Sequence, residues 1–278
     1  LFFHTGSLSV KLKAGILYDY EKFLEQFILD NVYEEEKIDL YQNFNIEALR
    51  SASVNKRENI TCDFRLRPEG NREYRWFTMS LMLPHGAGGA VGAILDIHDK
   101  KMHELEMQHQ ASHDAMTNLL NRQAFERAVF SYFMQGGKCG AYCLMDVDDF
   151  KQVNDRNGHP FGDQVLSLLA ESLKASFTGC LSGRIGGDEF LVYTGGDEPE
   201  MEDFLEMARA FCRDWDCRQK RLGLSRRISI CMGIALYPQH GDNYESLWQN
   251  ADKALYISKR SGKSAIAVAD GRSPQEDL

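Results

Sequence analysis

Hydrophobic and polar residues alternate over three short runs in the first part of the chain, as is typical of β-strands with one buried face. In the first run Phe64 and Leu66 fall on one face, and Arg65 and Arg67 fall on the other. Turn sequences containing Gly separate the runs from one another. The predicted strands of this antiparallel meander are residues 61–67, 72–83 and 90–97.

Helical patterns flank the meander on both sides. Residues 20–30 place Phe23 and Phe27 at helical spacing. Residues 99–113 contain neither Gly nor Pro and predict a connecting helix. A short coiled-coil seam or a solvated helix would both fit this segment. The residues at heptad-like spacing are Met102, Leu105, His109 and Ser112.

The rest of the chain alternates between apolar runs of strand length and longer stretches with an apolar stripe at helical spacing. This order predicts an α+β fold with a β-α-β-β-α-β core and extra helices. The expected helices are 117–133, 162–177, 199–217 and 244–260. The expected strands are 139–146, a hairpin over 181–194, 227–236 and 264–269.

Length and composition allow two ordinary domains, since the chain has 278 residues, of which 43% are hydrophobic and 26% charged. The formal net charge of −9 repels phosphate backbones, which argues against a nucleic-acid partner. The net charge does not exclude a small anionic substrate, because metal ions and a few lysines can neutralise its charge locally.

Seven cysteines without a CxxC pair favour a reduced protein in the cytoplasm. No apolar run approaches the roughly 20 residues that a membrane-spanning helix needs. The chain begins at Leu1 in place of Met, so we expect a fragment of a longer protein. A membrane segment upstream in that parent protein stays open.

The predicted strand 139–146 runs into three acidic residues, Asp146, Asp148 and Asp149. Carboxylates at the end of a buried strand are costly unless a positive charge compensates them. Mg²⁺ meets this need, because it prefers hard oxygen ligands and binds through one or two carboxylates together with substrate phosphates. Acids that only cap a loop would fit this run equally well.

The sequence RIGGDEFLVY at residues 184–193 favours the metal interpretation. Gly186 and Gly187 are expected to form the two-residue turn of a hairpin, whose central positions need positive φ. Their bare backbone would also let a phosphate or a ribose approach closely. Asp188 and Glu189 follow at once, so the hairpin can bring Asp188 to the same metal ion as Asp146.

These residues lie in ordered motifs that resemble the GGDEF family of diguanylate cyclases. The RIGGDEF signature is accompanied by residues 144–166, which resemble the family's Asp-x-Asp-x-Phe-Lys block almost position for position. Residues 113–125 resemble the opening segment, with Asn118 where Gly is usual, and residues 229–238 and 251–264 resemble the closing segments. The resemblance implies a palm-like β-α-β-β-α-β catalytic fold.

The resemblance also implies a metal site and a base. Asp146 and Asp188 would hold Mg²⁺ or Mn²⁺ by their side chains, and Val147 by its carbonyl. The base that accepts a proton from the attacking hydroxyl would be Asp188 or Glu189.

The substrate is implied to be GTP. Asn154 and Asp163 would read guanine, because guanine presents two adjacent N–H donors to a carboxylate and adenine does not. The lysines would neutralise the triphosphate, and His159 is expected mainly to fix its loop. The implied substrate-binding residues are Asp149, Phe150, Lys151, Asn154, His159, Asp163, Gly186, Gly187, Lys259 and Lys263.

The N-terminal part resembles a PAS sensor domain, because its last predicted strand ends in LDIHDKK at residues 95–101 before the connecting helix. The expected domains are a PAS-like domain truncated at its start over 1–98, a helical linker over 99–113 and a GGDEF domain over 114–278. The sequence does not name the signal that the sensor would detect.

The predicted function is condensation of two GTP into cyclic di-GMP with release of two pyrophosphates, in a homodimer regulated by the sensor. A degenerate domain that binds GTP or cyclic di-GMP as a receptor is the main alternative, and a plain interaction module is another. Many family members carry an inhibitory Arg-x-x-Asp site for product. The corresponding residues here are Phe177-Thr178-Gly179-Cys180, so strong product inhibition at that site is not expected.

Overall fold

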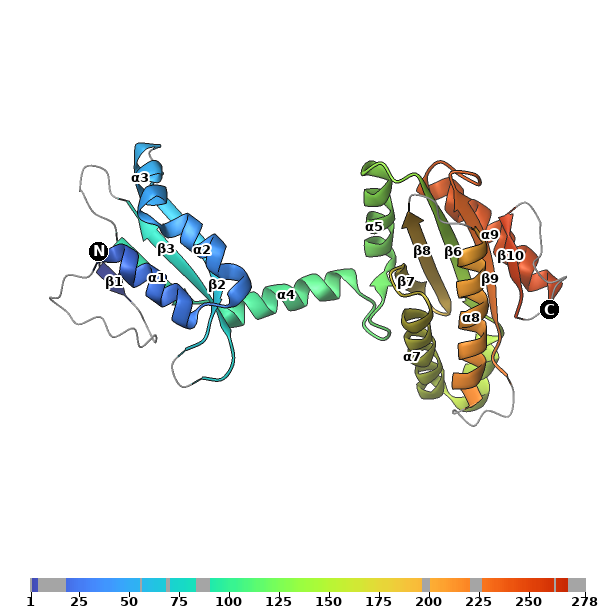
Figure 1. Cartoon of the computed structure of the whole chain (residues 1–278). Coiled ribbons are helices and arrows are strands. Elements are labelled where there is room, and N and C mark those ends of the chain that lie inside the picture. The colour runs from blue at the N-terminus through green and yellow to red at the C-terminus, as the bar shows by residue number, and fades with distance from the viewer. Residues whose placement is uncertain are drawn as a thin grey trace. The chain divides into compact units, whose positions relative to one another are not determined.

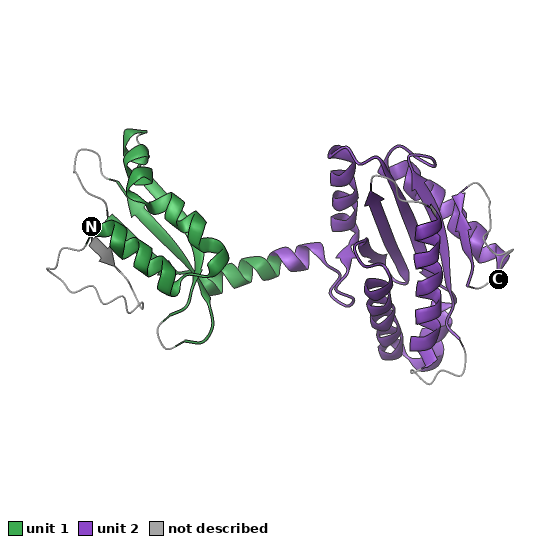
Figure 2. Ribbon diagram, viewed as in Figure 1, with its two compact units in different colours: residues 1–107 green, residues 108–278 purple. Residues whose placement is uncertain are grey.

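The chain divides into two compact units, residues 1–107 and residues 108–278 (Figure 2). The boundary falls inside helix α4 (His98–Ser112). The structure, a computed structural model, describes residues 2–4, 19–55, 57–68, 71–83, 91–196, 201–220, 227–262 and 264–269. None of the helices in these described ranges is both long enough and apolar enough to cross a membrane.

The N-terminal unit is built on a four-stranded sheet in the order β1-β4-β3-β2 (Figure 1). Strands β2, β3 and β4 form the predicted antiparallel meander, and β1 pairs in parallel with β4. The elements are β1 (Phe2–His4), α1 (Tyr20–Asn31), η1 (Glu34–Glu36), α2 (Lys37–Phe44), α3 (Ile46–Val54), β2 (Asn59–Leu66), β3 (Arg75–Met82) and β4 (Val91–Asp96).

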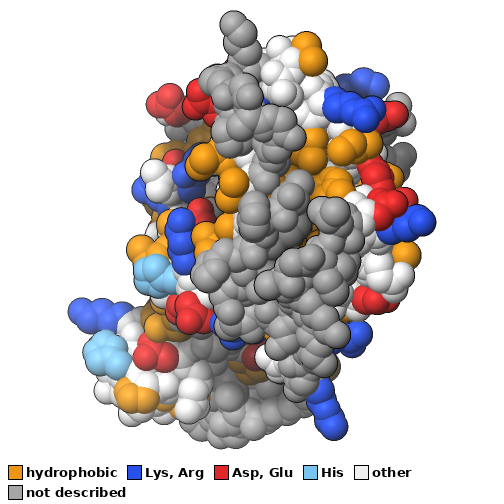
Figure 3. All heavy atoms as spheres, turned by 90° about the vertical axis from the view of Figure 1, so that its left-hand side faces the viewer, with side chains coloured by type: hydrophobic (Ala, Val, Ile, Leu, Met, Phe, Trp, Pro, Cys, Tyr) orange, Lys and Arg blue, Asp and Glu red, His pale blue; other side chains and the backbone are white. Residues whose placement is uncertain are grey.

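The helices of this unit cover one face of the meander. Leu24 of α1 and Phe44 of α2 are fully buried against Phe64 and Phe77 of the sheet. The opposite face carries a polar cluster in which the guanidinium of Arg65 stacks on Tyr33, 3.8 Å from its ring centre. On the described part of the face in Figure 3, acidic, basic and hydrophobic side chains are interspersed.

The C-terminal unit contains a six-stranded mixed sheet in the order β10-β9-β6-β8-β7-β5 (Figure 1). The run β6-α7-β7-β8-α8-β9 is the predicted β-α-β-β-α-β core. The elements are β5 (Leu120–Asn121), α5 (Arg122–Met134), β6 (Cys139–Val147), α6 (Phe150–Asn157), α7 (His159–Ser176), β7 (Leu181–Gly186), β8 (Glu189–Gly196), α8 (Met201–Gln219), β9 (Ile230–Tyr237), α9 (Tyr244–Ser261) and β10 (Ile266–Val268).

Helices cover both faces of this sheet, and the alternation of side chains along β6 assigns each face its partners. Cys143 and Met145 belong to the core that contains α7 and α8. Tyr142 and Leu144 belong to the core that contains α5 and α9. The central strand is therefore buried on both sides, which explains its continuous apolar run.

One predicted helix begins later than expected. The pattern predicted a helix over 117–133, but α5 starts at Arg122, and residues 114–119 form a loop. Asn118 has a left-handed φ of 53°, and the Asn121 side chain caps α5 by accepting a hydrogen bond from the N–H of Ala124. The predicted apolar stripe began at Leu120, which lies in β5 and packs against the same core as Phe125 and Val129.

Candidate functional site

Strand alternation brings Asp146 and Glu189 together at one end of the sheet. Asp146 follows Tyr142 and Leu144 at even spacing, so it lies on the face covered by α5 and α9. Glu189 is its direct partner on the antiparallel strand β8. Paired residues on neighbouring strands share a face, and like charges at such a pair are destabilising. Two acids opposite each other therefore indicate a site that binds a cation.

The turn between β7 and β8 supplies the third acid. We expected Gly186 and Gly187 to be its central residues, but this was wrong. Gly186 still pairs with Glu189, and Gly187 and Asp188 form the turn. A register shift between Arg184 and Gly186 adds a residue to β7 and moves the turn along the chain by one position. Asp188 thus lies at the tip of the hairpin.

The three carboxylates repel one another. Burial raises the pKa of Glu189, and the charges of Asp146 and Asp188 raise it further. Burial likewise raises the pKa of Asp146, whose side chain is only 13% exposed, against the opposing effect of Lys259. The Lys259 ammonium on α9 lies 2.8 Å from the Asp146 carboxylate. The one positive charge of Lys259 offsets only part of the negative charge of the three carboxylates.

A divalent cation fits this donor set. The carboxylates of Asp146 and Asp188 are hard oxygen ligands, and the lysine ammonium already marks where positive charge is stabilised. Within the described ranges, no group of three or more His, Cys, Asp or Glu side chains is placed to hold a metal ion by protein ligands alone. A magnesium site does not require one, because Mg²⁺ takes one or two carboxylates and fills its remaining positions with water and phosphate oxygens.

Asp148 has a different role from its neighbour Asp146. Its carboxylate accepts hydrogen bonds from the Ser229 hydroxyl at 2.5 Å and from the backbone N–H of Ser264 at 3.4 Å. Its own N–H donates to the Ser229 carbonyl at 2.9 Å. Asp148 therefore joins the ends of β6, β9 and β10. For this acid, the interpretation as a structural residue is the better one.

The chain leaves β6 through a strained residue into α6. Asp149 takes a left-handed φ of 54° and precedes Phe150, the first residue of the helix. The first backbone amides of α6 thus begin at the predicted phosphate-binding residues, where a helix N-terminus favours negative charge. Lys151 lies exposed in the first turn of the same helix. Phe150 packs partly into the core beneath it.

Asn154 and Gly162 form a close contact between α6 and α7. The Oδ1 atom of Asn154 is buried and has no hydrogen-bond partner. A Cβ atom at position 162 would lie 1.9 Å from that oxygen, so only glycine leaves room for it. An unsatisfied buried acceptor is costly, so a group of this kind calls for a partner such as a water molecule or a bound ligand. Gly162 was not among our predicted site residues, although it lies in the segment 144–166 that resembles the family.

The other predicted substrate residues lie on the surface or outside the description. Asp163 and His159 are exposed in the first turns of α7, after Gly158 with its φ of 85°. Lys263 lies outside the described residues. The structure thus brings Asp146, Asp188, Glu189 and Lys259 together. Asn154 lies on α6, and His159, Gly162 and Asp163 lie on α7; these two helices follow β6 in the chain.

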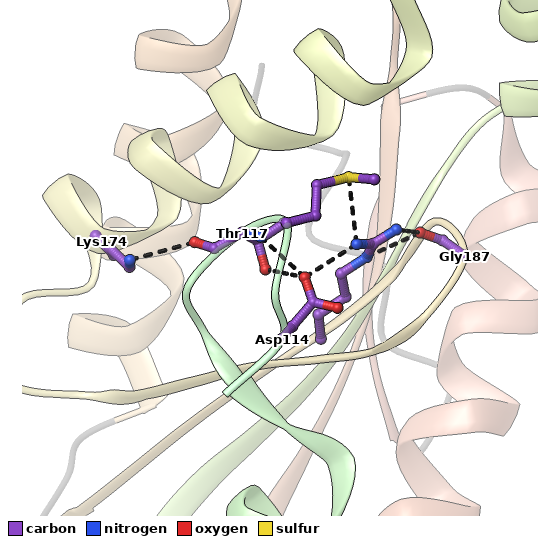
Figure 4. Close-up of polar contacts among 6 residues, drawn as sticks. Asp114, Thr117, Lys174 and Gly187 are labelled. Carbon is purple, nitrogen blue, oxygen red and sulfur yellow. Dashed lines mark hydrogen bonds and ion pairs between the residues drawn. The ribbon is translucent and has the colours of Figure 1, made fainter. Parts of the chain in front are cut away.

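Arg184 fixes the hairpin turn from below and was not predicted as a site residue. It is 8% exposed, and its Nε and Nη2 groups donate to the carbonyl of Gly187 at 3.0 and 2.7 Å. Its Nη1 group donates to Asp114 at 3.0 Å. Figure 4 shows the Asp114 carboxylate between Thr117 and this guanidinium. The signal was present as the first letter of RIGGDEF.

Hydrogen bonds keep Asp114 ionised. Burial alone would raise the pKa of its carboxyl, but hydrogen bonds from the hydroxyl and N–H of Thr117 and from Arg184 outweigh burial and hold the pKa below its usual range. The carboxyl groups of Glu189 and Asp114, which both lie near the turn, therefore differ: the pKa of Glu189 is raised and that of Asp114 is lowered.

Phe177 packs in the core, as its position in the apolar stripe of α7 predicted. It is 1% exposed, and its ring centre lies 5.7 Å from those of Phe204 and Phe211. No guanidinium or carboxylate is available at positions 177–180.

A mixed sheet with helices on both faces and an acidic hairpin turn at one end of its strands is the palm-like fold that the resemblance implied. Residues 111–265, more than half of the chain, match the family model described as diguanylate cyclase, GGDEF domain. The chain belongs to the GGDEF domain family.

Named relatives agree with this membership. An uncharacterized signaling protein of Caulobacter vibrioides is 33% identical over 223 residues, which are 74% of this chain and 27% of that protein. Diguanylate cyclase TpbB of Pseudomonas aeruginosa is 34% identical over 179 residues, 61% of this chain and 40% of TpbB. The match therefore spans well under half the length of these curated relatives.

A solved structure shares the fold of the C-terminal part. The coiled coil and GGDEF domain of DgcB from Caulobacter crescentus, in complex with c-di-GMP, superposes with a TM-score of 0.54 and 26% identity. The superposition covers 62% of this chain and 93% of the DgcB chain.

Proposed function

We propose that this protein is a diguanylate cyclase that condenses two GTP molecules into cyclic di-GMP and releases two pyrophosphates. The observation that carries the proposal is the convergence of Asp146, Asp188 and Glu189 beside Lys259 at the tip of the β7–β8 hairpin. A receptor that only binds nucleotide would not need a third acid beside the two metal ligands, whereas a catalyst needs a base.

The residues of this chain would divide the work. Asp146 and Asp188, with the Val147 carbonyl, would hold Mg²⁺ or Mn²⁺, which lowers the pKa of a bound hydroxyl and offsets phosphate charge. The 3′-hydroxyl of one GTP forms a bond to the α-phosphorus of the other, and the bond to pyrophosphate breaks. The proton passes to Glu189 or Asp188. The same exchange in the opposite direction closes the ring.

Substrate contacts would come from α6 and α7 and from α9. The amides at Asp149 and Phe150, together with Gly186 and Gly187, would meet phosphate and ribose, while Lys151, Lys259 and Lys263 neutralise charge. The guanine edge would donate to Asp163 and to the unsatisfied oxygen of Asn154. His159 would hold the loop before α7 in place.

Each domain would bind one GTP, so turnover would require two copies of the chain facing each other. We assign residues 1–98 as a PAS-like sensor, 99–113 as a helical linker and 114–278 as the catalytic domain. The sensor would regulate catalysis through the linker. The catalytic part would act in the cytoplasm, where GTP is available.

Product analysis tests the proposal directly. Purified protein with GTP and Mg²⁺ is expected to yield cyclic di-GMP, and EDTA is expected to abolish its formation. Asp203→Asn removes one negative charge from an exposed position on α8. It is the control for substitutions of the acids in the site and should retain activity. Guanine-nucleotide binding without pyrophosphate release would favour a receptor instead, and absence of nucleotide binding would favour an interaction module.

A further inference from the structure

A six-residue loop links the last turn of α4 to the catalytic hairpin. The N–H of Asp114 donates to the Leu119 carbonyl at 2.8 Å, and the N–H of Asn118 donates to the Asp114 carbonyl at 2.9 Å. Thr117 and Leu119 are buried. Residues 114–119, which we call the hinge loop, are therefore closed by their own backbone and move most easily as one piece.

The inner end of the hinge loop is tied to the turn that carries Asp188. Asp114 accepts a hydrogen bond from Arg184, and Arg184 donates twice to the Gly187 carbonyl. Met116 adds a sulfur contact to the same guanidinium at 3.4 Å. Because the guanidinium is planar and rigid, a shift of Asp114 is passed to the Gly187 carbonyl with little loss.

The outer end of the hinge loop is tied to α4 through Asn118. The Nε2 atom of His109 lies 2.6 Å from Oδ1 of Asn118, and since that oxygen only accepts, the imidazole donates. The His109 ring stacks on His113 with centres 4.0 Å apart, which holds it in place. A glycine, the usual residue at this position in the resembling motif, has no side chain that could make this contact.

Polar contacts rather than packing restrain this end. Lys174 of α7 donates to the carbonyl of Asn118 at 2.8 Å. It also donates to the carbonyl of Thr117 at 3.3 Å, the contact drawn in Figure 4. An open surface groove of about 320 Å³ borders Asn118, Lys174 and His113. Close packing, which would otherwise fix the loop, is therefore absent on the side of this groove.

We propose that His109 and Asn118 are positioning residues for the Gly187–Asp188 turn. The last turn of α4 holds Asn118 through His109, the hinge loop holds Arg184 through Asp114, and Arg184 holds the carbonyl next to Asp188. A change in the linker helix thus reaches the metal-binding turn within a single domain. The inference rests on the proposed function of that turn.

Substitutions at position 118 test the chain of contacts. Asn118→Gly accepts the left-handed φ but removes the acceptor, whereas Asn118→Asp accepts the same φ and keeps an acceptor. We expect Asn118→Gly and His109→Ala each to lower kcat about threefold to tenfold, the effect of one lost hydrogen bond. The KM for GTP should stay unchanged, and Asn118→Asp should retain parental kcat.

A double-mutant cycle shows whether the two residues act through each other. The combination of His109→Ala with Asn118→Gly should be no slower than either single variant. His103→Ala, an exposed histidine on the same helix, is the matched control and should keep the parental rate. Additive losses in the double variant, or equal rates for Asn118→Gly and Asn118→Asp, would overturn the proposal.

Hydrogen exchange separates this inference from the proposed function. In His109→Ala we expect faster amide exchange at residues 187–189, which are 78 or more positions away in sequence. A merely structural role would lower the unfolding temperature and leave that local exchange unchanged. The exchange measurement needs no turnover, so it decides the inference even if the protein makes no cyclic di-GMP.

Discussion

Two sets of acids surround the Gly187–Asp188 turn, and their environments differ. Asp114 and Asp148 accept well-formed hydrogen bonds from Thr117, Arg184 and Ser229. Asp146 and Glu189 instead face each other across two strands with Lys259 as their nearby cation. The first set stabilises the fold. The carboxylates of the second set repel each other, and a bound cation can relieve this repulsion. The acids of the first set build the site. The acids of the second set, whose mutual repulsion Lys259 offsets only in part, are the ones available for chemistry.

The largest expected effect separates the two sets by activity. Asp188→Ala and Asp146→Ala should each lower kcat by a factor on the order of 10²–10³ or more, because each removes a ligand of the metal ion that offsets phosphate charge in the transition state. Asp148→Asn should cost far less, and should lower the unfolding temperature instead. A cyclase assay with thermal unfolding of all three variants measures both effects. Near-parental turnover of Asp188→Ala would contradict the metal assignment.

The second effect concerns stability. Asp114→Ala should destabilise the fold by about 2 kcal/mol, below the roughly 3–5 kcal/mol of a fully buried pair, because Asp114 is 25% exposed while Arg184 is nearly buried. Glu189→Gln should leave stability unchanged or raise it, since it removes repulsion. Urea unfolding in EDTA measures both. Equal destabilisation by the two variants would break the comparison.

Asp163 extends the comparison to base recognition. This acid is exposed on α7 and is expected to accept from guanine. Asp163→Asn should raise the KM for GTP about tenfold and narrow the preference for GTP over ATP, because an amide cannot accept two donors as a carboxylate does. Binding measurements with both nucleotides test this. Unchanged GTP affinity would place guanine recognition elsewhere.

Acid titration gives a smaller effect of defined sign. The pKa of Asp114 is lower in the folded state than in the unfolded state, so its contribution to stability is complete above the unfolded-state value. That contribution is lost as the pH falls from the unfolded-state pKa through the folded-state pKa. The parental protein should therefore lose more stability on acidification than Asp114→Asn. Parallel stability curves for the two proteins would contradict this assignment.

The smallest expected effect is product inhibition. Positions 177–180 contain neither type of charged group that could hold a second cyclic di-GMP, and Phe177 is committed to the core. Product should therefore inhibit only weakly, by competing at the active site. Progress curves with added cyclic di-GMP distinguish the cases. Strong noncompetitive inhibition at low micromolar product would reveal a separate binding surface.

The spacing of apolar residues predicted most of the fold, because a long apolar stripe fits either the period of a helix or that of a strand and so identifies the element. The stripe of α7 and the run of β6 were both placed correctly to within a few residues. Short polar elements escaped prediction. The helix α6, with Lys151 and Asn154, has no fully buried residue, and only Phe150 and Val153 of its eight residues pack against the core, so its apolar stripe is too short to predict a helix.

Residue types in the candidate site were predictable, but their geometry was not. The acidic end of the strand and the hairpin predicted that Asp146 and Asp188 share a metal ion, and the resemblance supplied the other assignments. The roles of the site residues stay predictions. Sequence could not show that a register shift moves the turn to Gly187–Asp188. Nor could it show that Arg184 reaches Asp114, because that contact joins residues 70 positions apart.

The alternation along β6 makes the candidate site sensitive to the length of this strand. Insertion of one residue between Cys143 and Asp146 would turn the side chain of Asp146 toward α7 and α8 and send its apolar neighbour toward Lys259. The same error would place a carboxylate in the core that contains Phe190 and Val165. Such an insertion would harm folding and chemistry at once. Variation that lengthens this protein is therefore expected in its loops, whereas this strand can change in composition but not in length.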